Sequence, residues 1–76
     1  MNDILNNTEE AIIFGQSMNE DMMEEMKRGQ KMYRVMSKLA TKEQDWDKAS
    51  KVAFKAQLCR EAVEAYNGTL KLRNQA

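Results

Sequence analysis

The sequence predicts an all-α protein built on an antiparallel helical hairpin, and three observations lead to this fold class. Apolar residues between Ala49 and Leu70 recur at alternating spacings of three and four, which places them along one narrow face of a helix. A similar spacing runs from Met18 to Ala40. The chain also has no proline and only three glycines, so it lacks the residues that turns between β-strands need.

The length of the chain predicts one helical domain over residues 1–76. A domain this small buries only about 60% of the surface that its unfolded chain exposes, so the isolated monomer should be marginally stable. Seven methionines supply flexible side chains, which fill gaps but specify packing weakly. The composition therefore favours a hairpin that completes a small, coiled-coil-like bundle by associating with itself or with another protein.

The first predicted helix covers residues 8–16. An approximate capping box at Asn7 marks its start, and the apolar run Ala-Ile-Ile-Phe follows. A glycine and a second start signal at Ser17 then place a break or kink near residues 15–19. This segment either forms a separate helix that folds back on the others or continues into the second helix.

The second predicted helix covers residues 19–40. Its apolar face is rich in methionine, and Met32 and Leu39 widen that face on one side. Gly29 occupies one position of the face and costs about 1 kcal/mol relative to alanine, so we expect either a close approach of the neighbouring helix or a bend there. Acidic residues crowd the first turns and basic residues follow, an order that complements the helix dipole.

The third predicted helix covers residues 42–67 and carries the longest apolar face. Thr41 begins a capping box at its start. A connection this short makes the two long helices antiparallel neighbours. Asn67 and Gly68 predict the end of the helix, because both residues tolerate the left-handed conformation of a C-terminal cap.

The apolar faces of the two long helices predict the residues that pack the helices together or form an interface. These residues are Met22, Met26, Tyr33, Met36, Val52, Cys59, Val63 and Tyr66. Phe54 and Leu58 lie off this seam. We therefore expect a second contact surface, which either residues 11–14 or another subunit covers.

The residue types argue against most catalytic and metal chemistry. The chain has no histidine and a single cysteine, Cys59, which leaves no disulfide framework, zinc knuckle or cysteine–histidine nucleophile. Cys59 falls within the seam, so we expect a small buried apolar residue there rather than a reactive thiol. We expect no enzyme activity, cofactor, metal or small-molecule substrate. Neither a signal peptide nor a membrane span is expected, so the expected location is the cytoplasm.

Charge is distributed unevenly along the chain, although its net value is zero. No lysine or arginine precedes Lys27. Folding the hairpin gathers basic residues towards its closed end, and the candidate polyanion-binding residues are Lys27, Arg28, Lys31, Arg34, Lys48, Lys51 and Lys55. Three explanations stay open: complementarity to the helix dipole on solvated faces, docking of an acidic part of one chain on a basic part of another, and nucleic-acid binding.

The expected function is that of a small non-catalytic interaction protein, such as an adaptor, chaperone or inhibitor, that acts through protein–protein contacts. The alternative is an accessory nucleic-acid-binding module that uses the basic end of the hairpin. The sequence contains no nucleic-acid recognition motif and few aromatic residues, which favours the first hypothesis.

Overall fold

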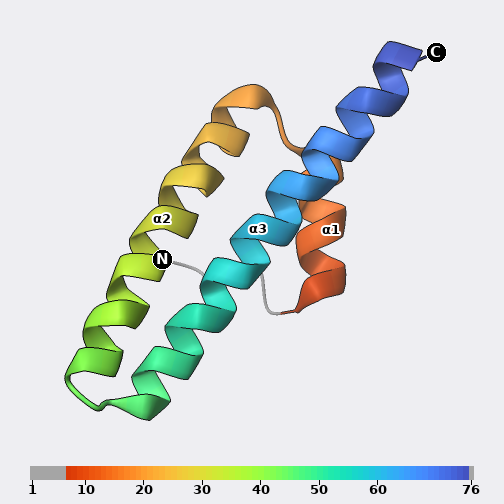
Figure 1. The fold of residues 1–76 in the computed structure, drawn as a ribbon. Helices are drawn as coiled ribbons and strands as arrows, with labels where there is room; N and C mark the ends of the chain where they lie inside the picture. The colour runs from red at the N-terminus through yellow and green to blue at the C-terminus, as the bar shows by residue number, and fades with distance from the viewer. Residues whose placement is uncertain (1–6, 76) are drawn as a thin grey trace.

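The computed structural model describes residues 7–75, which form three α-helices (Figure 1). Helix α1 spans Thr8–Ser17, α2 spans Glu20–Lys42 and α3 spans Trp46–Gln75. Helices α2 and α3 form the antiparallel hairpin, and α1 is a separate helix that folds back on it. The predicted all-α class, the hairpin and the additional N-terminal helix are therefore confirmed.

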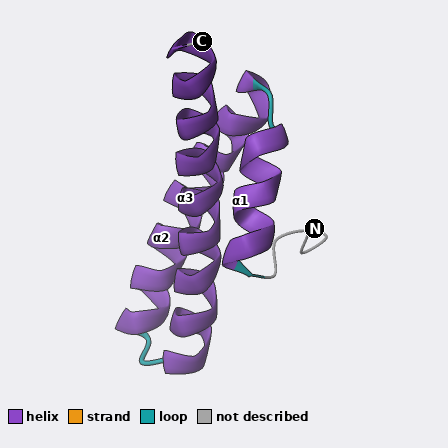
Figure 2. Cartoon of the chain, turned by 90° about the vertical axis from the view of Figure 1, so that its right-hand side faces the viewer, coloured by secondary structure: helices purple, strands orange, loops and turns teal. Residues whose placement is uncertain are grey.

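Helix α3 is the central element of the fold. Helix α2 packs along one side of it, and α1 packs on a different side of its middle part (Figures 1 and 2). Helix α1 scarcely touches α2, although the two are consecutive in the chain. The result is an elongated molecule of 49 × 19 × 18 Å, in which α2 has a packing partner on one side only.

The core forms where all three helices meet. Its buried residues are Ala11, Met18, Met23, Leu58, Ala62 and Val63, with Phe14, Met26 and Tyr66 packed against them. Towards the closed end of the hairpin, the buried seam is narrower and consists of Ala40, Ala49, Val52, Ala56 and Cys59. Because small side chains let helix backbones approach closely, the alanines of this seam suit a tight α2–α3 contact.

The two residues predicted to lie off the seam have different surroundings. Leu58 belongs to the same buried cluster as Ala11, so α1 covers part of the expected second contact surface. Phe54 remains exposed. Of the two alternatives, the segment containing residues 11–14 is therefore the cover over Leu58.

Side-chain caps define the starts of α1 and α2. The Asn7 side chain accepts a hydrogen bond from the Glu10 amide at 2.9 Å, which confirms the predicted start of α1. At the start of α2, the Asn19 side chain accepts a hydrogen bond from the Met22 amide at 2.9 Å. The predicted start signal at Ser17 is wrong, because Ser17 ends α1 and its hydroxyl donates to a carbonyl of the preceding turn.

The connection between α2 and α3 lies later in the chain than predicted. Helix α2 continues to Lys42, and the Thr41 hydroxyl donates to the Ser37 carbonyl within it, so Thr41 does not cap α3. Gln44 adopts a left-handed conformation with φ of 62°, and Asp45 then accepts a hydrogen bond from the Lys48 amide at 3.2 Å. Asp45 is therefore the N-cap of α3, in place of the predicted Thr41.

The predicted end of α3 at Asn67 and Gly68 is also wrong. The helix runs through both residues to Gln75. A helical glycine costs only about 1 kcal/mol. Leu70, Lys71 and Leu72 are good helix formers that follow the glycine, and they offset this local cost.

The closest approach between helices lies at Gly15 rather than at Gly29. A Cβ atom at Gly29 would lie 3.8 Å from the Cys59 Sγ atom, which is an ordinary contact. A Cβ atom at Gly15 would overlap the carbonyl oxygen of Ala62 and lie 2.9 Å from the Cβ atom of Ala65. Gly15 therefore permits α1 to lie directly on the backbone of α3, and it does not interrupt α1.

Replacing Asp45 with alanine should lower the free energy of unfolding by about 1 kcal/mol, because the change removes the acceptor for the Lys48 amide at the start of α3. Thr41→Ala is the matched control and should change stability little, since the Thr41 hydroxyl only bonds within α2. Urea unfolding curves of both variants provide the measurement. A larger loss for Thr41→Ala than for Asp45→Ala would contradict this start of α3.

Candidate functional site

Most of the predicted seam residues pack the hairpin within one chain. Val52, Cys59 and Val63 are buried, and the partly buried seam residues are Met26, Tyr33, Met36 and Tyr66. These side chains hold the three helices of the monomer together. They are therefore largely used inside the fold.

Met22 is the exception among the predicted seam residues, because its side chain is exposed. The adjacent Met23 is buried instead, in the same cluster as Met18. Residues one position apart differ by about 100° around a helix, so the two methionines face different directions. The core at the open end of the hairpin therefore extends towards the α1–α2 connection rather than following the seam of α2.

The outer side of α2 carries an exposed apolar stripe that sequence reasoning did not identify as a surface. We name Met32, Val35 and Leu39 the outer stripe; their side chains are 61%, 57% and 54% exposed. Their spacing of three and four residues places them on one face of α2. Tyr33 and Ala40, in contrast, are turned towards the hairpin. The signal was present in the sequence as the widened face at Met32 and Leu39, but Val35 was needed to complete it.

The predicted basic residues of α3 lie beside acidic ones. Lys48, Lys51 and Lys55 line a groove of about 360 Å³ together with Asp45 and Asp47. Lys51 forms an ion pair with Asp47 at 3.3 Å. The Lys55 ammonium lies 5.9 Å from the centre of the Tyr33 ring, which is within cation–π range. The positive charge of this predicted cluster is therefore partly neutralised.

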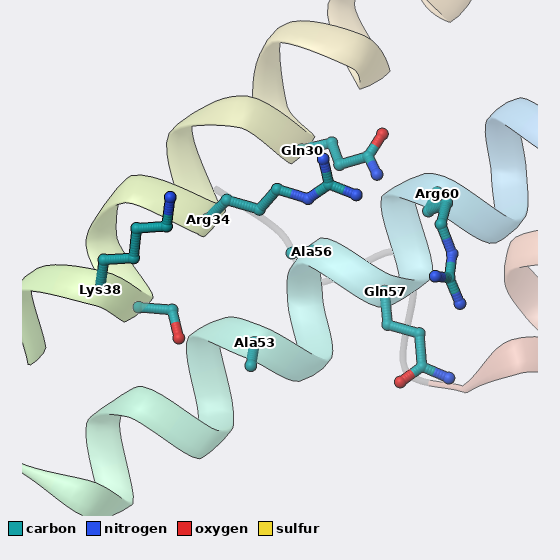
Figure 3. Close-up of a pocket in the computed structure, with 8 residues that line it drawn as sticks. Gln30, Arg34, Lys38, Ala53, Ala56, Gln57 and Arg60 are labelled. Atoms are coloured by element: carbon teal, nitrogen blue, oxygen red, sulfur yellow. The ribbon is translucent and has the colours of Figure 1, made fainter. Parts of the chain in front are cut away.

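A more uniformly basic groove lies on the other side of the hairpin. Its volume is about 330 Å³, and no acidic residue lines it (Figure 3). The residues that line it are Gln30, Arg34, Ser37, Lys38, Ala53, Ala56, Gln57 and Arg60. We name it the basic groove. Of its three cations, only Arg34 was in the predicted set; Arg60 was missed because it stands far from the others in sequence and is brought beside them by the hairpin.

The cations of the basic groove do not converge on one point. Figure 3 shows Arg34 extending from α2 towards Ala56 of α3, whereas the side chain of Arg60 turns away from α2. Arg60 also lies 3.8 Å from each of two carboxylates, Glu61 and Glu64. The remaining predicted residues Lys27, Arg28 and Lys31 are exposed on α2 and line neither groove. The basic groove suits a diffuse anionic surface better than a single bound anion.

Cys59 is buried against α2, and burial raises the pKa of its thiol above the ordinary value. The thiol is therefore protonated at neutral pH, and the neutral form is the poorer nucleophile. Within residues 7–75, no group of three or more potential metal ligands comes together. None of the three helices, as far as they are described, has the length and apolar character needed to cross a bilayer.

Two open surfaces of the described chain are candidate binding surfaces: the outer stripe of α2 and the basic groove between α2 and α3. The first is apolar and belongs to one helix, and the second is polar and shared by two helices. Both are long and shallow features of a rod-shaped molecule. No protein-family model, curated protein or solved structure matches the chain.

Proposed function

We propose that the protein is a small non-catalytic interaction protein that binds a helix of another polypeptide chain along the outer stripe of α2. The observation that supports this proposal is the exposure of Met32, Val35 and Leu39 on a helix that packs on only one side. An exposed apolar row of this kind is typical of a protein-binding surface. Spacings of three and four residues match the way a helix presents its side chains to a partner helix.

The magnitude of apolar burial is consistent with a reversible contact. Full burial of a valine, leucine or methionine side chain contributes about 1.5–3 kcal/mol, and the three stripe residues are each more than half exposed. Covering them would contribute about 1 kcal/mol each, or about 3 kcal/mol in all. Polar contacts along the flanks of α2 must supply the remainder, since association itself carries a cost of several kcal/mol.

Site-specific photo-crosslinking tests this proposal in cells that express the protein. A benzophenone amino acid at Val35 should give a covalent adduct of one discrete mass, because the outer stripe is where the partner helix lies. The matched control is the same amino acid at Ser50, which is exposed on α3 and outside both grooves. The proposal fails if position 35 gives no adduct, or if both positions give the same adducts.

Polyanion binding is a second candidate function, favoured by one observation: the basic groove carries three cations and no acidic lining residue. If each cation contacts one phosphate of DNA, affinity should fall about 40-fold between about 50 mM and 200 mM salt. Filter binding to mixed-sequence DNA at these two concentrations measures the effect. Protein that binds no DNA at the lower concentration contradicts this candidate.

Paired charge reversals locate any DNA contact. Arg34→Glu with Lys38→Glu should abolish binding if the basic groove is used. Lys48→Glu with Lys51→Glu is the matched control on the opposite groove, where aspartates already offset the lysines. Equal losses from the two pairs would mean that the basic groove has no special role.

A further inference from the structure

We infer that the basic groove binds single-stranded nucleic acid and that Trp46 stacks on one of the bases. This inference deepens the second candidate function, polyanion binding, and rests on it; it does not depend on the helix proposed for the outer stripe. Trp46 is the only tryptophan of the chain, and its side chain is 62% exposed. An open aromatic ring beside a row of cations is the combination with which proteins hold single strands.

Trp46 lies on the same side of α3 as the basic groove. Residues seven positions apart differ by only about 20° around a helix, so Trp46, Ala53 and Arg60 form one row along α3. Ala53 and Arg60 both line the basic groove, and Trp46 continues their row to the closed end of the hairpin. The acidic neighbours Asp45 and Asp47 line the opposite groove instead. The aromatic ring therefore extends the basic groove by one heptad.

The opposite wall of the groove, on α2, is positive along its length. Arg34 and Lys38 line the groove, and Lys27 and Lys31 stand seven residues before them on the same two rows of α2. All four side chains are exposed, and within residues 7–75 none of the four forms an ion pair. These cations are therefore open to contact with the phosphates of a bound strand.

The register of the hairpin places one of these cations at the level of the aromatic ring. The Ser37 hydroxyl donates to the Ala49 carbonyl at 3.2 Å, so the two residues lie side by side. Lys38 follows Ser37, and Trp46 precedes Ala49 by three residues, so Lys38 and Trp46 lie within one helical turn of each other along the hairpin. A base stacked on Trp46 would therefore bring its phosphate towards Lys38.

The exposed ring favours a single strand over a duplex or a membrane. In a duplex the bases stack on one another and present only their edges, so Trp46 would find no base face. A membrane surface suits the site less well, because the cations line a groove and the exposed apolar residues of the outer stripe lie on a different face of α2. An unpaired strand supplies both the phosphates and the open base faces that this groove can contact.

Intrinsic fluorescence tests the inference on the 76-residue protein, because every tryptophan signal comes from Trp46. A thymidylate oligomer of about 12 nucleotides should quench this fluorescence at about 50 mM salt. An abasic deoxyribose-phosphate oligomer of the same length carries the charge without the bases and should cause no quenching. If three cations each contact one phosphate of a single strand, affinity for the thymidylate should fall about 20-fold at about 200 mM salt.

Fluorescence anisotropy of labelled oligomers separates stacking from charge. Trp46→Ala should weaken binding of the thymidylate about tenfold and leave binding of the abasic oligomer unchanged, and Trp46→Tyr should recover most of the loss. The matched control is Phe54→Ala, which removes another exposed aromatic residue of α3 that lines neither groove. This control should change neither affinity. Circular dichroism spectra verify that each variant keeps its helices.

The outcomes distinguish the inference from the candidate function on which it rests. Equal affinity for the thymidylate, the abasic oligomer and a duplex of the same length overturns the inference but leaves polyanion binding intact, as does a Trp46→Ala variant that binds the thymidylate like the wild type. A protein that binds no oligomer at the lower salt overturns both. Binding to phosphatidylserine vesicles alone, with a blue shift of the Trp46 emission, would also overturn both and identify a membrane surface.

Discussion

Replacing Gly15 with alanine should destabilise the protein by about 2 kcal/mol, although the same exchange inside a helix normally stabilises by about 1 kcal/mol. The stability change has the opposite sign here because α1 packs directly on the backbone of α3. A methyl group at Gly15 would overlap the Ala62 carbonyl oxygen and crowd the Ala65 side chain at 2.9 Å. Backbone atoms cannot turn aside as a flexible side chain can, so α1 must move away from α3 and expose part of the core.

Gly68→Ala is the matched control for this prediction. Gly68 is also helical, but a Cβ atom there would meet nothing within 4 Å, so alanine should stabilise α3 by up to about 1 kcal/mol. Guanidinium unfolding of the two variants measures the difference. If both alanines stabilise the protein equally, then α1 does not lie on the backbone of α3 in the way described.

Replacing Leu58 with alanine should remove about 3 kcal/mol of stability, within the range of about 2–5 kcal/mol for a buried leucine. Leu58 is 2% exposed and is the largest fully buried side chain among the described residues. Its removal would leave a cavity where α1 and α3 meet, and a chain of this size has little stability to spare. The variant should therefore populate the unfolded state even without denaturant.

Phe54→Ala controls for the loss of a large apolar residue on the same helix. Phe54 lies one turn before Leu58 and is 45% exposed, so we expect a loss of less than about 1 kcal/mol. Thermal melts followed by circular dichroism would compare the two. Similar losses at both positions would show that α1 does not cover Leu58 in preference to Phe54.

The periodicity of apolar residues predicted the hairpin, because the seam of each long helix packs against the other long helix, which is next to it in the chain. Val52, Cys59 and Val63 repeat at helical spacing and are buried as expected. The packing position of α1 could not be predicted in the same way, because no local sequence signal indicates which side of α3 a short helix will cover. Leu58 and Phe54 were therefore equivalent in the sequence, and only the position of α1 separates them.

Local signals failed where several residues could serve the same purpose. Thr41 and Asp45 are both good caps, and the start of α3 follows the later one because Gln44 accepts the left-handed turn before it. Gly15 resembled a helix breaker, yet its lack of a side chain serves a contact with a segment 47 positions away at Ala62. Such a role depends on tertiary structure and cannot be recognised from the neighbouring residues in the sequence.

The candidate surfaces were predicted only in part for a similar reason. Counting charges located the basic end of the hairpin but not the two grooves on its opposite sides. Asp45 and Asp47 fall beside the predicted lysines of α3, whereas Arg60 joins Arg34 from a distant part of the chain. The outer stripe lies on a face that becomes distinct only once α1 is known to lie on α3 and not on α2.

Because α1 docks on α3 and not on its neighbour α2, we expect a definite order of folding. The α2–α3 contacts join residues near a tight turn, such as Ser37 and Ala49, whose hydroxyl and carbonyl lie 3.2 Å apart. The contact of Gly15 with Ala62 closes a much longer loop, which costs more entropy. We therefore expect the hairpin to form first and α1 to add last. The amide hydrogens of α1 should accordingly exchange with solvent through a local opening that leaves the hairpin intact.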